Sequence, residues 1–159
     1  MSNTLSVPEN LKRFYLAQNT GTPNFHEKAV AELFSGCKKS HWIWFVLPQL
    51  LGLGHSEKSK KFGINDLLEA QEYLENKLLK DRLEEIITVI AEQLKIPEQS
   101  LTNLMGSELD AIKTISSLTL FEAAGLEIAS MLLDQLGTRC PMTQELLRSR
   151  GNVLPRADA

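Results

Sequence analysis

The most restrictive feature of the sequence is an apolar stripe near the middle of the chain. Its six members recur at spacings of four, three, one, three and four residues: Leu79, Leu83, Ile86, Ile87, Ile90 and Leu94. These spacings follow the helical period and place the stripe on one face. The charged residues between them fall on the opposite face. We therefore expect a long amphipathic helix with its apolar face in the core and its charged face in solvent.

Helix-starting and helix-ending residues predict further, shorter helices before this stripe. They are expected over residues 8–18 with a cap at Ser6, 23–36, 56–62 with a cap at Ser56, and 66–75. The solvent face of the second of these helices is expected to carry Glu27, Lys28 and Glu32. Asp66 and Glu69 have the spacing of a capping box, in which each side chain binds the other residue's backbone amide.

Residues that start or end helices also occur after the apolar stripe. Helical segments are expected after Pro97, Ser107, Gly125 and Pro141, and the segment after Ser107 has Leu109, Ile112, Ser116 and Leu120 at helical spacing. The sequence therefore predicts an all-α fold of about seven to nine short helices, in a single domain over residues 1–150. Residues 151–159 carry no packing pattern and are expected to form a loose tail.

Composition narrows the classes of partner. The 17 Lys and Arg residues against 20 Asp and Glu give a net charge of -3, which disfavours nucleic acid as a partner. Cys37 and Cys140 form no C-x-x-C pair, which is typical of a reducing compartment. The longest apolar run, Trp42 to Leu47, is too short to span a bilayer. We expect a cytoplasmic protein with no membrane partner.

Both tryptophans lie in one segment, Lys38 to Gln49. Its consecutive apolar residues fit either a buried strand or a short buried helix, and we favour a helix because a lone strand would have no hydrogen-bonding partner. On a helix, Trp42 and Trp44 point in nearly opposite directions. At least one is therefore expected in the core, while the alternative has one indole stacking on a base or a cation.

The same segment carries the polar residues that invite a chemical interpretation. His41 is either an acid or base near neutral pH or a structural residue packed on Trp42. Lys38 and Lys39, with Ser40, either bind a phosphate or carboxylate or are solvated lysines near a helix end. Gln49 needs a defined partner, from protein or ligand, if it is buried.

The other histidines and the known site motifs give no further evidence for a functional site. His26 and His55 are expected to be exposed or to cap helices, and the three histidines lack metal-ligand spacing, so no metal site is predicted. Neither a nucleotide-binding glycine loop nor a nucleophile motif is complete in this sequence. Spacing alone therefore assigns no cofactor and no reaction type.

Several motifs together resemble the bacterial domain-of-unknown-function family 1810. They are Ser40-His41-Trp42-x-Trp44-Phe45-x-x-Pro48-Gln49, Gly52-Leu53-Gly54-x-Ser56, Ser116-Ser117-x-Thr119-Leu120-Phe121, Arg13-Phe14-x-x-Ala17-Gln18, Glu69-Ala70-x-x-Tyr73-Leu74 and Asp110-x-x-Lys113. The resemblance implies a multihelical all-α fold and a cytoplasmic protein of undetermined activity. Ile43 and Leu118 depart from its usual methionines, and His26 departs from a usual tyrosine.

Polar members of these motifs suggest one common site. The predicted ligand-binding residues are Lys39, Ser40, His41, Trp42, Gln49, Ser56, Lys113, Ser117 and Thr119. Lys39 and Lys113 would contact a small anionic or nucleotide-like ligand, Trp42 would stack on it, and His41 with Ser40 are the candidate catalytic pair if the ligand is hydrolysed. The alternative is a protein-interaction module without catalytic activity, whose helices present an apolar or acidic face to a protein partner.

Overall fold

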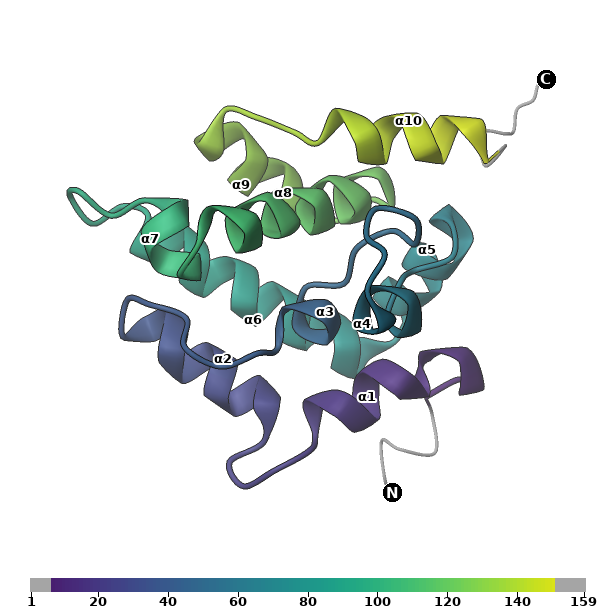
Figure 1. Cartoon of the computed structure of the whole chain (residues 1–159), viewed down its shortest axis with the longest axis horizontal. Helices are drawn as coiled ribbons and strands as arrows, with labels where there is room; N and C mark the ends of the chain where they lie inside the picture. The colour runs from purple at the N-terminus through teal and green to yellow at the C-terminus, as the bar shows by residue number, and fades with distance from the viewer. Residues whose placement is uncertain (1–6, 151–159) are drawn as a thin grey trace.

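In the computed structural model, which describes residues 7–150, a 3-10 turn over Glu9–Leu11 leads into ten α-helices (Figure 1). In chain order they are α1 (Lys12–Gln18), α2 (Phe25–Phe34), α3 (Ile43–Val46), α4 (Glu57–Lys61), α5 (Leu67–Glu75), α6 (Lys77–Gln93), α7 (Leu101–Met105), α8 (Glu108–Ala123), α9 (Glu127–Leu136) and α10 (Pro141–Ser149). Within that range no strand forms. The predicted all-α fold is confirmed, with ten helices instead of seven to nine. The predicted cap at Ser6 and tail over 151–159 lie outside the described residues.

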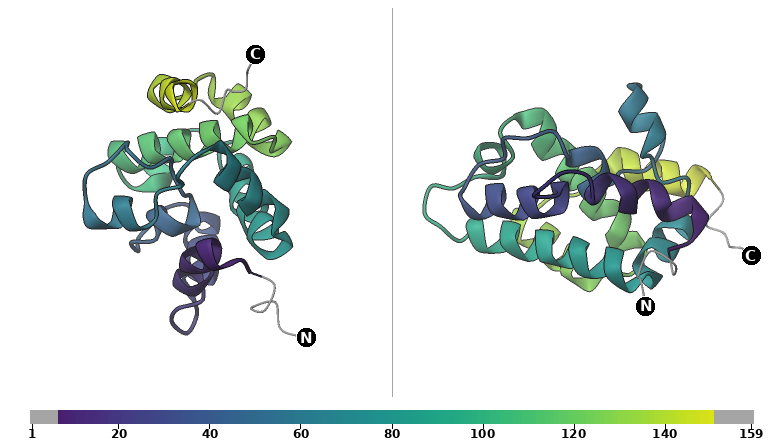
Figure 2. Two further views of the ribbon diagram at one scale, coloured as in Figure 1. Left: turned by 90° about the vertical axis from the view of Figure 1, so that its right-hand side faces the viewer. Right: turned by 90° about the horizontal axis from the view of Figure 1, so that it is seen from below.

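The predicted amphipathic helix is confirmed as α6, the longest of the ten. Its side chains Leu79, Leu83, Ile86, Ile87 and Ile90 are buried. Helices α2, α5 and α9 pack against it, and Figure 1 shows α6 crossing the molecule between α2 and α9. In Figure 2, α10 lies at the edge of the molecule away from α1. Neither α6 nor any other helix among residues 7–150 has the length and apolarity needed to cross a lipid bilayer.

The Trp-rich segment forms the one-turn helix α3, as the sequence predicts. Within this helix, the centre of the Phe45 ring lies 5.5 Å from the centre of the Phe25 ring and 5.2 Å from that of the Phe62 ring. Trp42 is wholly buried, whereas Trp44 is half-buried. The expectation that at least one indole belongs to the core is therefore confirmed by Trp42.

The face of α8 that packs in the core matches the predicted one only in part, since Ser116 and Leu120 are buried as expected. Leu109 and Ile112 were expected on the apolar face, but they are 63% and 52% exposed. The helix instead buries Thr114 and every residue over 116–121. Small hydroxyl side chains in this run let α5 and α9 pack closely on α8, so the spacing of large apolar residues does not mark its buried face.

The start of α7 also differs from the prediction. The helix begins at Leu101 and not at Pro97. Ser100 occupies the cap position, where its hydroxyl accepts a hydrogen bond from the amide of Asn103 at 3.0 Å. A serine can satisfy a first-turn amide in this way and a proline cannot, so Ser100 decides where the helix starts.

After α3 the chain doubles back and carries α4 on the resulting loop. The Leu51 amide donates to the Ile64 carbonyl at 2.7 Å, and the Ile64 amide donates to the Gln49 carbonyl at 2.8 Å. Gly63 lies so close to Leu51 that a Cβ would stand 2.8 Å from its Cα. This position therefore requires glycine. The predicted cap of α4 is confirmed, since the Ser56 hydroxyl accepts from the Ser59 amide at 3.1 Å.

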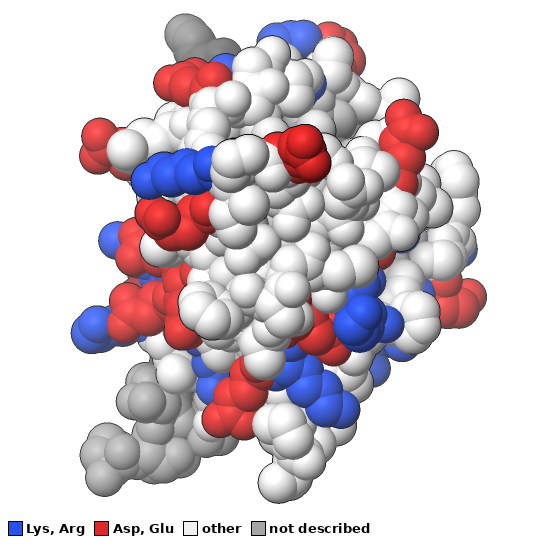
Figure 3. Space-filling view, turned by 90° about the vertical axis from the view of Figure 1, so that its left-hand side faces the viewer, with Lys and Arg blue, Asp and Glu red and all other residues white. Residues whose placement is uncertain are grey.

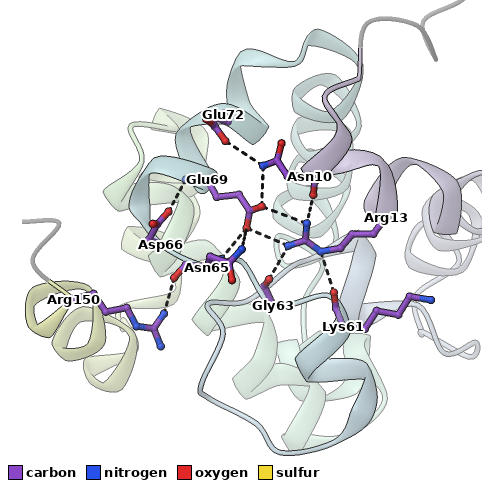
Figure 4. Close-up of polar contacts among 9 residues, drawn as sticks. All are labelled: Asn10, Arg13, Lys61, Gly63, Asn65, Asp66, Glu69, Glu72 and Arg150. Carbon is purple, nitrogen blue, oxygen red and sulfur yellow. Dashed lines mark hydrogen bonds and ion pairs between the residues drawn. The ribbon is translucent and has the colours of Figure 1, made fainter.

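A buried ion pair ties α1 to α5 (Figure 4). The Glu69 side chain is only 5% exposed, and its Oε1 lies 3.1 Å from Nη2 of Arg13. The same carboxylate accepts hydrogen bonds from the Asn65 amide at 2.8 Å and from Nδ2 of Asn10 at 2.9 Å. Arg13 also donates to the carbonyl of Gly63 at 2.8 Å. Two motifs that lie far apart in the sequence therefore meet at this pair.

The predicted capping box at the start of α5 is only half present. The Asp66 side chain accepts from the Glu69 amide at 2.9 Å, but the Glu69 carboxylate turns toward Arg13 instead of closing the box.

A second contact between α1 and α5 involves Gln18, which is buried and donates to the hydroxyl of Tyr73 at 3.1 Å.

Candidate functional site

Glu32, near the end of α2, binds the first part of the Trp-rich segment through hydrogen bonds. Its carboxylate accepts hydrogen bonds from the amides of Lys39 at 2.8 Å and Ser40 at 2.9 Å, from the Ser40 hydroxyl, and from Nε1 of Trp42 at 2.9 Å. Burial raises the pKa of Glu32, but these four donors together outweigh it and lower the pKa to about 2. The prediction that Glu32 faces solvent holds only in part: the residue is half-buried, because a loop that spacing along α2 does not reveal folds back over it.

Lys38 and Trp42 belong to the interior of the molecule. The Lys38 side chain is 6% exposed, and its Nζ lies 2.8 Å from Oδ2 of Asp110 and 5.1 Å from the centre of the Trp42 ring. Lys38 is therefore not the solvated lysine of the simpler interpretation. Trp42 has no exposed surface, so its ring cannot be the predicted stacking face for a ligand.

His26 is another correction. It was expected to be exposed or to cap a helix, but it is 8% exposed and its Nε2 lies 2.9 Å from Oε1 of Glu85 on α6. Burial lowers the pKa of His26 more than the contact with Glu85 raises it. His26 therefore makes a polar contact between α2 and α6.

Three other predicted site residues do not share one site. His41 is exposed at the start of α3. Ser117 is wholly buried in α8, where its hydroxyl has no hydrogen-bond partner among the described residues. Thr119 is also buried, and its hydroxyl donates to the Ile115 carbonyl at 2.8 Å and accepts from the Cys140 amide at 3.0 Å. Ser117 and Thr119 therefore lie within the packing of α8.

An open groove of about 420 Å³ lies between the loop after α3, helix α4, helix α8 and the start of α10. Its polar lining includes three of the predicted residues: Gln49, Ser56 and Lys113. Its other polar groups come from His55, Ser59, Ser116 and Cys140. Its apolar lining consists of Leu53, Leu109, Ile112 and Met142. The structure thus brings a third of the predicted set together in one groove and leaves Lys39, Ser40 and Trp42 around Glu32.

Trp44 lines this groove, and the ammonium groups of two lysines lie near its ring. Nζ of Lys58 is 5.1 Å and Nζ of Lys113 is 5.2 Å from the centre of its ring. Asp110 is 3.8 Å from Lys113, but it already makes a closer ion pair with Lys38. The Trp44 end of the groove therefore has an excess of positive charge.

Gln49 supplies an amide to the same groove. Its backbone carbonyl pairs with Ile64, but its side-chain amide makes no hydrogen bond within residues 7–150. The residue is half-buried and lines the groove beside Trp44. A side-chain amide in this position can donate to, and accept from, a molecule in the groove.

A family model for proteins of unknown function (DUF1810) matches residues 8–147. The chain belongs to this family. Among solved structures, this DUF1810 chain is similar to the conserved hypothetical protein Rv1873 from Mycobacterium tuberculosis, with 37% identity and a TM-score of 0.77. That similarity covers 87% of this chain and 96% of the other. No curated protein matches.

Several residues of the DUF1810 motifs make contacts that stabilise the fold. Arg13 binds Glu69, and the Asp110 of the Asp110-x-x-Lys113 motif binds Lys38. Charged and amide side chains in such motifs are therefore explained by packing and pairing. Gln49 and Lys113 differ, because both present polar groups to the groove.

Sequence reasoning missed Cys140 in this DUF1810 chain. It occupies the N-cap of α10, directly before Pro141, and lines the groove. Burial raises the pKa of its thiol, but the hydrogen bond from Ser116 and the polar groups in the first turn of α10 together outweigh it and lower the pKa. The available signal was Pro141, because a helix opened by a proline places the preceding residue at its cap.

Proposed function

We propose that the groove binds a small anionic ligand with a planar group, of nucleotide-like chemistry. The observation that supports this most is the half-exposed ring of Trp44, flanked by Lys58 and Lys113. The planar group stacks on Trp44, the anionic group lies by the lysines, and the Gln49 amide provides directional hydrogen bonds. In this assignment Trp44 takes the stacking role first expected of Trp42.

The groove has the composition expected of a small-molecule site. Its volume of about 420 Å³ falls in the range of roughly 300–1,000 Å³ typical of ligand pockets. The apolar lining residues Leu53, Leu109, Ile112 and Met142 suit the uncharged part of the ligand. The proposal stops at binding, because His41, the predicted base, is not among the residues that line the groove.

Replacing Lys113 by alanine is expected to weaken binding of adenosine 5′-monophosphate about tenfold, since one of two cations at Trp44 is lost. Titration calorimetry at moderate salt measures the change. Lys95→Ala is the matched control, because Lys95 is exposed, pairs with Glu92 at 3.1 Å and does not line the groove. Adenosine and inorganic phosphate, tested separately, should each bind more weakly than the nucleotide. Equal affinity in both lysine variants would remove the anion contact from the proposal.

A second candidate function is the docking of a protein partner on an apolar surface. Figure 3 shows an uncharged area across the centre of one face, with acidic and basic side chains around it. Phe34, 76% exposed, is one of several large apolar side chains at the surface of the described residues. In this case, substitution of Lys113 or Gln49 leaves partner binding unchanged, which separates the two candidates.

A further inference from the structure

We propose that Cys140 is a modification site in the groove, where its sulfur attacks small anionic disulfides and forms a mixed disulfide with them. The preference for anionic disulfides rests on the proposed function, because it depends on the lysines at Trp44. The reactivity of the sulfur itself does not depend on that function.

Hydrogen-bond donors surround the Cys140 sulfur. The Ser116 hydroxyl, on a side chain that is 3% exposed, donates to Sγ at 3.3 Å. Cys140 is the N-cap of α10, so Met142 and Thr143 lie in the first turn, where the backbone amides have no acceptor within the helix. These donors, together with the positive end of the α10 dipole, favour a negative charge on Sγ.

The Thr143 hydroxyl gives an independent indication. Thr143 is wholly buried, and its hydroxyl has no hydrogen-bond partner of good geometry among residues 7–150. Thr143 lies in the first turn of α10, three residues after Cys140. A buried hydroxyl without an acceptor is unfavourable, and an ionised sulfur on Cys140 would offer it one.

These donors lower the pKa of the Cys140 thiol despite its burial, so a larger share of it is thiolate near neutral pH than in an ordinary cysteine. The sulfur is also accessible, because Cys140 is half-buried and lines the groove together with Lys113. Cys37 provides a contrast within the same chain. Its sulfur lies 3.5 Å from the Lys38 carbonyl, an acceptor that does not stabilise a thiolate.

The reaction is a thiol–disulfide exchange. The Cys140 thiolate attacks one sulfur of the incoming disulfide, a new S–S bond forms to Sγ, and the original S–S bond breaks. The second sulfur leaves with the bonding electrons as a thiolate and takes a proton from solvent according to its own pKa. No oxidant is needed beyond the disulfide itself, which is reduced as Cys140 is oxidised.

The experiment uses the full chain and 5,5′-dithiobis(2-nitrobenzoate), an anionic aromatic disulfide whose released thiolate is coloured. One thiol is expected to react faster than the other by on the order of tenfold. Cys37→Ser should keep the fast phase and Cys140→Ser should lose it, while Ser116→Ala should slow it. Peptide mapping of the briefly treated wild type locates the modified cysteine without any variant.

A fast phase that survives in Cys140→Ser, or a first modification mapped to Cys37, overturns the assignment of Cys140. The anionic preference is tested with the neutral 2-hydroxyethyl disulfide, each rate being divided by that of free glutathione. Lys113→Ala should slow the anionic reagent alone. If Lys113→Ala slows neither reagent while Cys140 stays fast, the anionic preference and its link to the proposed function are overturned, and the reactive thiol stands.

Discussion

Replacing Glu69 by alanine is expected to lower the free energy of unfolding by about 3 kcal/mol. The substitution leaves the Arg13 guanidinium without its carboxylate, and it removes the acceptor for the Asn65 amide and one of two acceptors for Nδ2 of Asn10. Because the Arg13 side chain is 22% exposed, water compensates part of the loss, and we place the effect at the lower end for buried pairs. Urea denaturation followed by tryptophan fluorescence measures it.

The control for this prediction is an exposed ion pair of the same type. Lys77 and Asp81 lie 2.7 Å apart on α6, with side chains 89% and 55% exposed. Asp81→Ala is therefore expected to change the free energy of unfolding by less than about 0.5 kcal/mol. Similar losses in Glu69→Ala and Asp81→Ala would show that the contacts of Glu69 in Figure 4 contribute no more to stability than a surface ion pair does.

Glu32→Ala is expected to destabilise the protein by about 2 to 3 kcal/mol, the second largest effect. The substitution leaves the indole N–H of Trp42 without an acceptor inside the core, and it releases the turn held by the amides of Lys39 and Ser40. Urea denaturation gives the size of the loss. Glu92→Ala, which removes an exposed carboxylate paired with Lys95, is the matched control and should have little effect.

The contribution of Glu32 also has a defined pH dependence. Its pKa is lowered from 4.5 to about 2 on folding, so its contribution to stability is complete above about pH 4.5 and is lost as the pH falls toward 2. The free energy of unfolding of the wild type should fall over this window. In Glu32→Gln, which cannot titrate, the fall should be smaller. An identical pH profile for both proteins would show that the carboxylate is not stabilised in the folded state.

The sequence predicts the helices of this protein better than it predicts their contacts. The stripe from Leu79 to Leu94 shows its periodicity because α6 buries one face and exposes the other. Helix α8 buries residues all round its second half, so its periodicity is weak and the exposure of Leu109 and Ile112 cannot be read from spacing.

Polar residues of the candidate site are harder to predict, because their partners come from elsewhere in the chain. Glu32 binds a loop that returns over α2, and Lys38 binds Asp110 on α8. The sequence does point to the Trp-rich segment, but it cannot separate Trp42, which is core, from Trp44, which lies in the groove. The difference depends on how α3 packs on α8.

The DUF1810 motifs combine two kinds of residue. Pairs such as Arg13 with Glu69 hold helices together, and their substitution is expected to change stability. Gln49 and Lys113 present polar groups to the groove, and their substitution is expected to change binding with little effect on stability. Comparing unfolding and binding for the same variants distinguishes the two kinds.

Heteronuclear NMR of nitrogen-labelled protein, titrated with adenosine 5′-monophosphate, tests the proposed binding groove most directly. The two tryptophans provide an internal comparison, because Trp42 is buried and bonded to Glu32 while Trp44 lines the groove. We predict that the indole N–H signal of Trp44 and the side-chain amide signals of Gln49 shift with a saturable dependence on ligand, while that of Trp42 stays in place. Saturable shifts elsewhere with Trp44 and Gln49 unmoved, or no saturable shifts at all, would contradict the proposal.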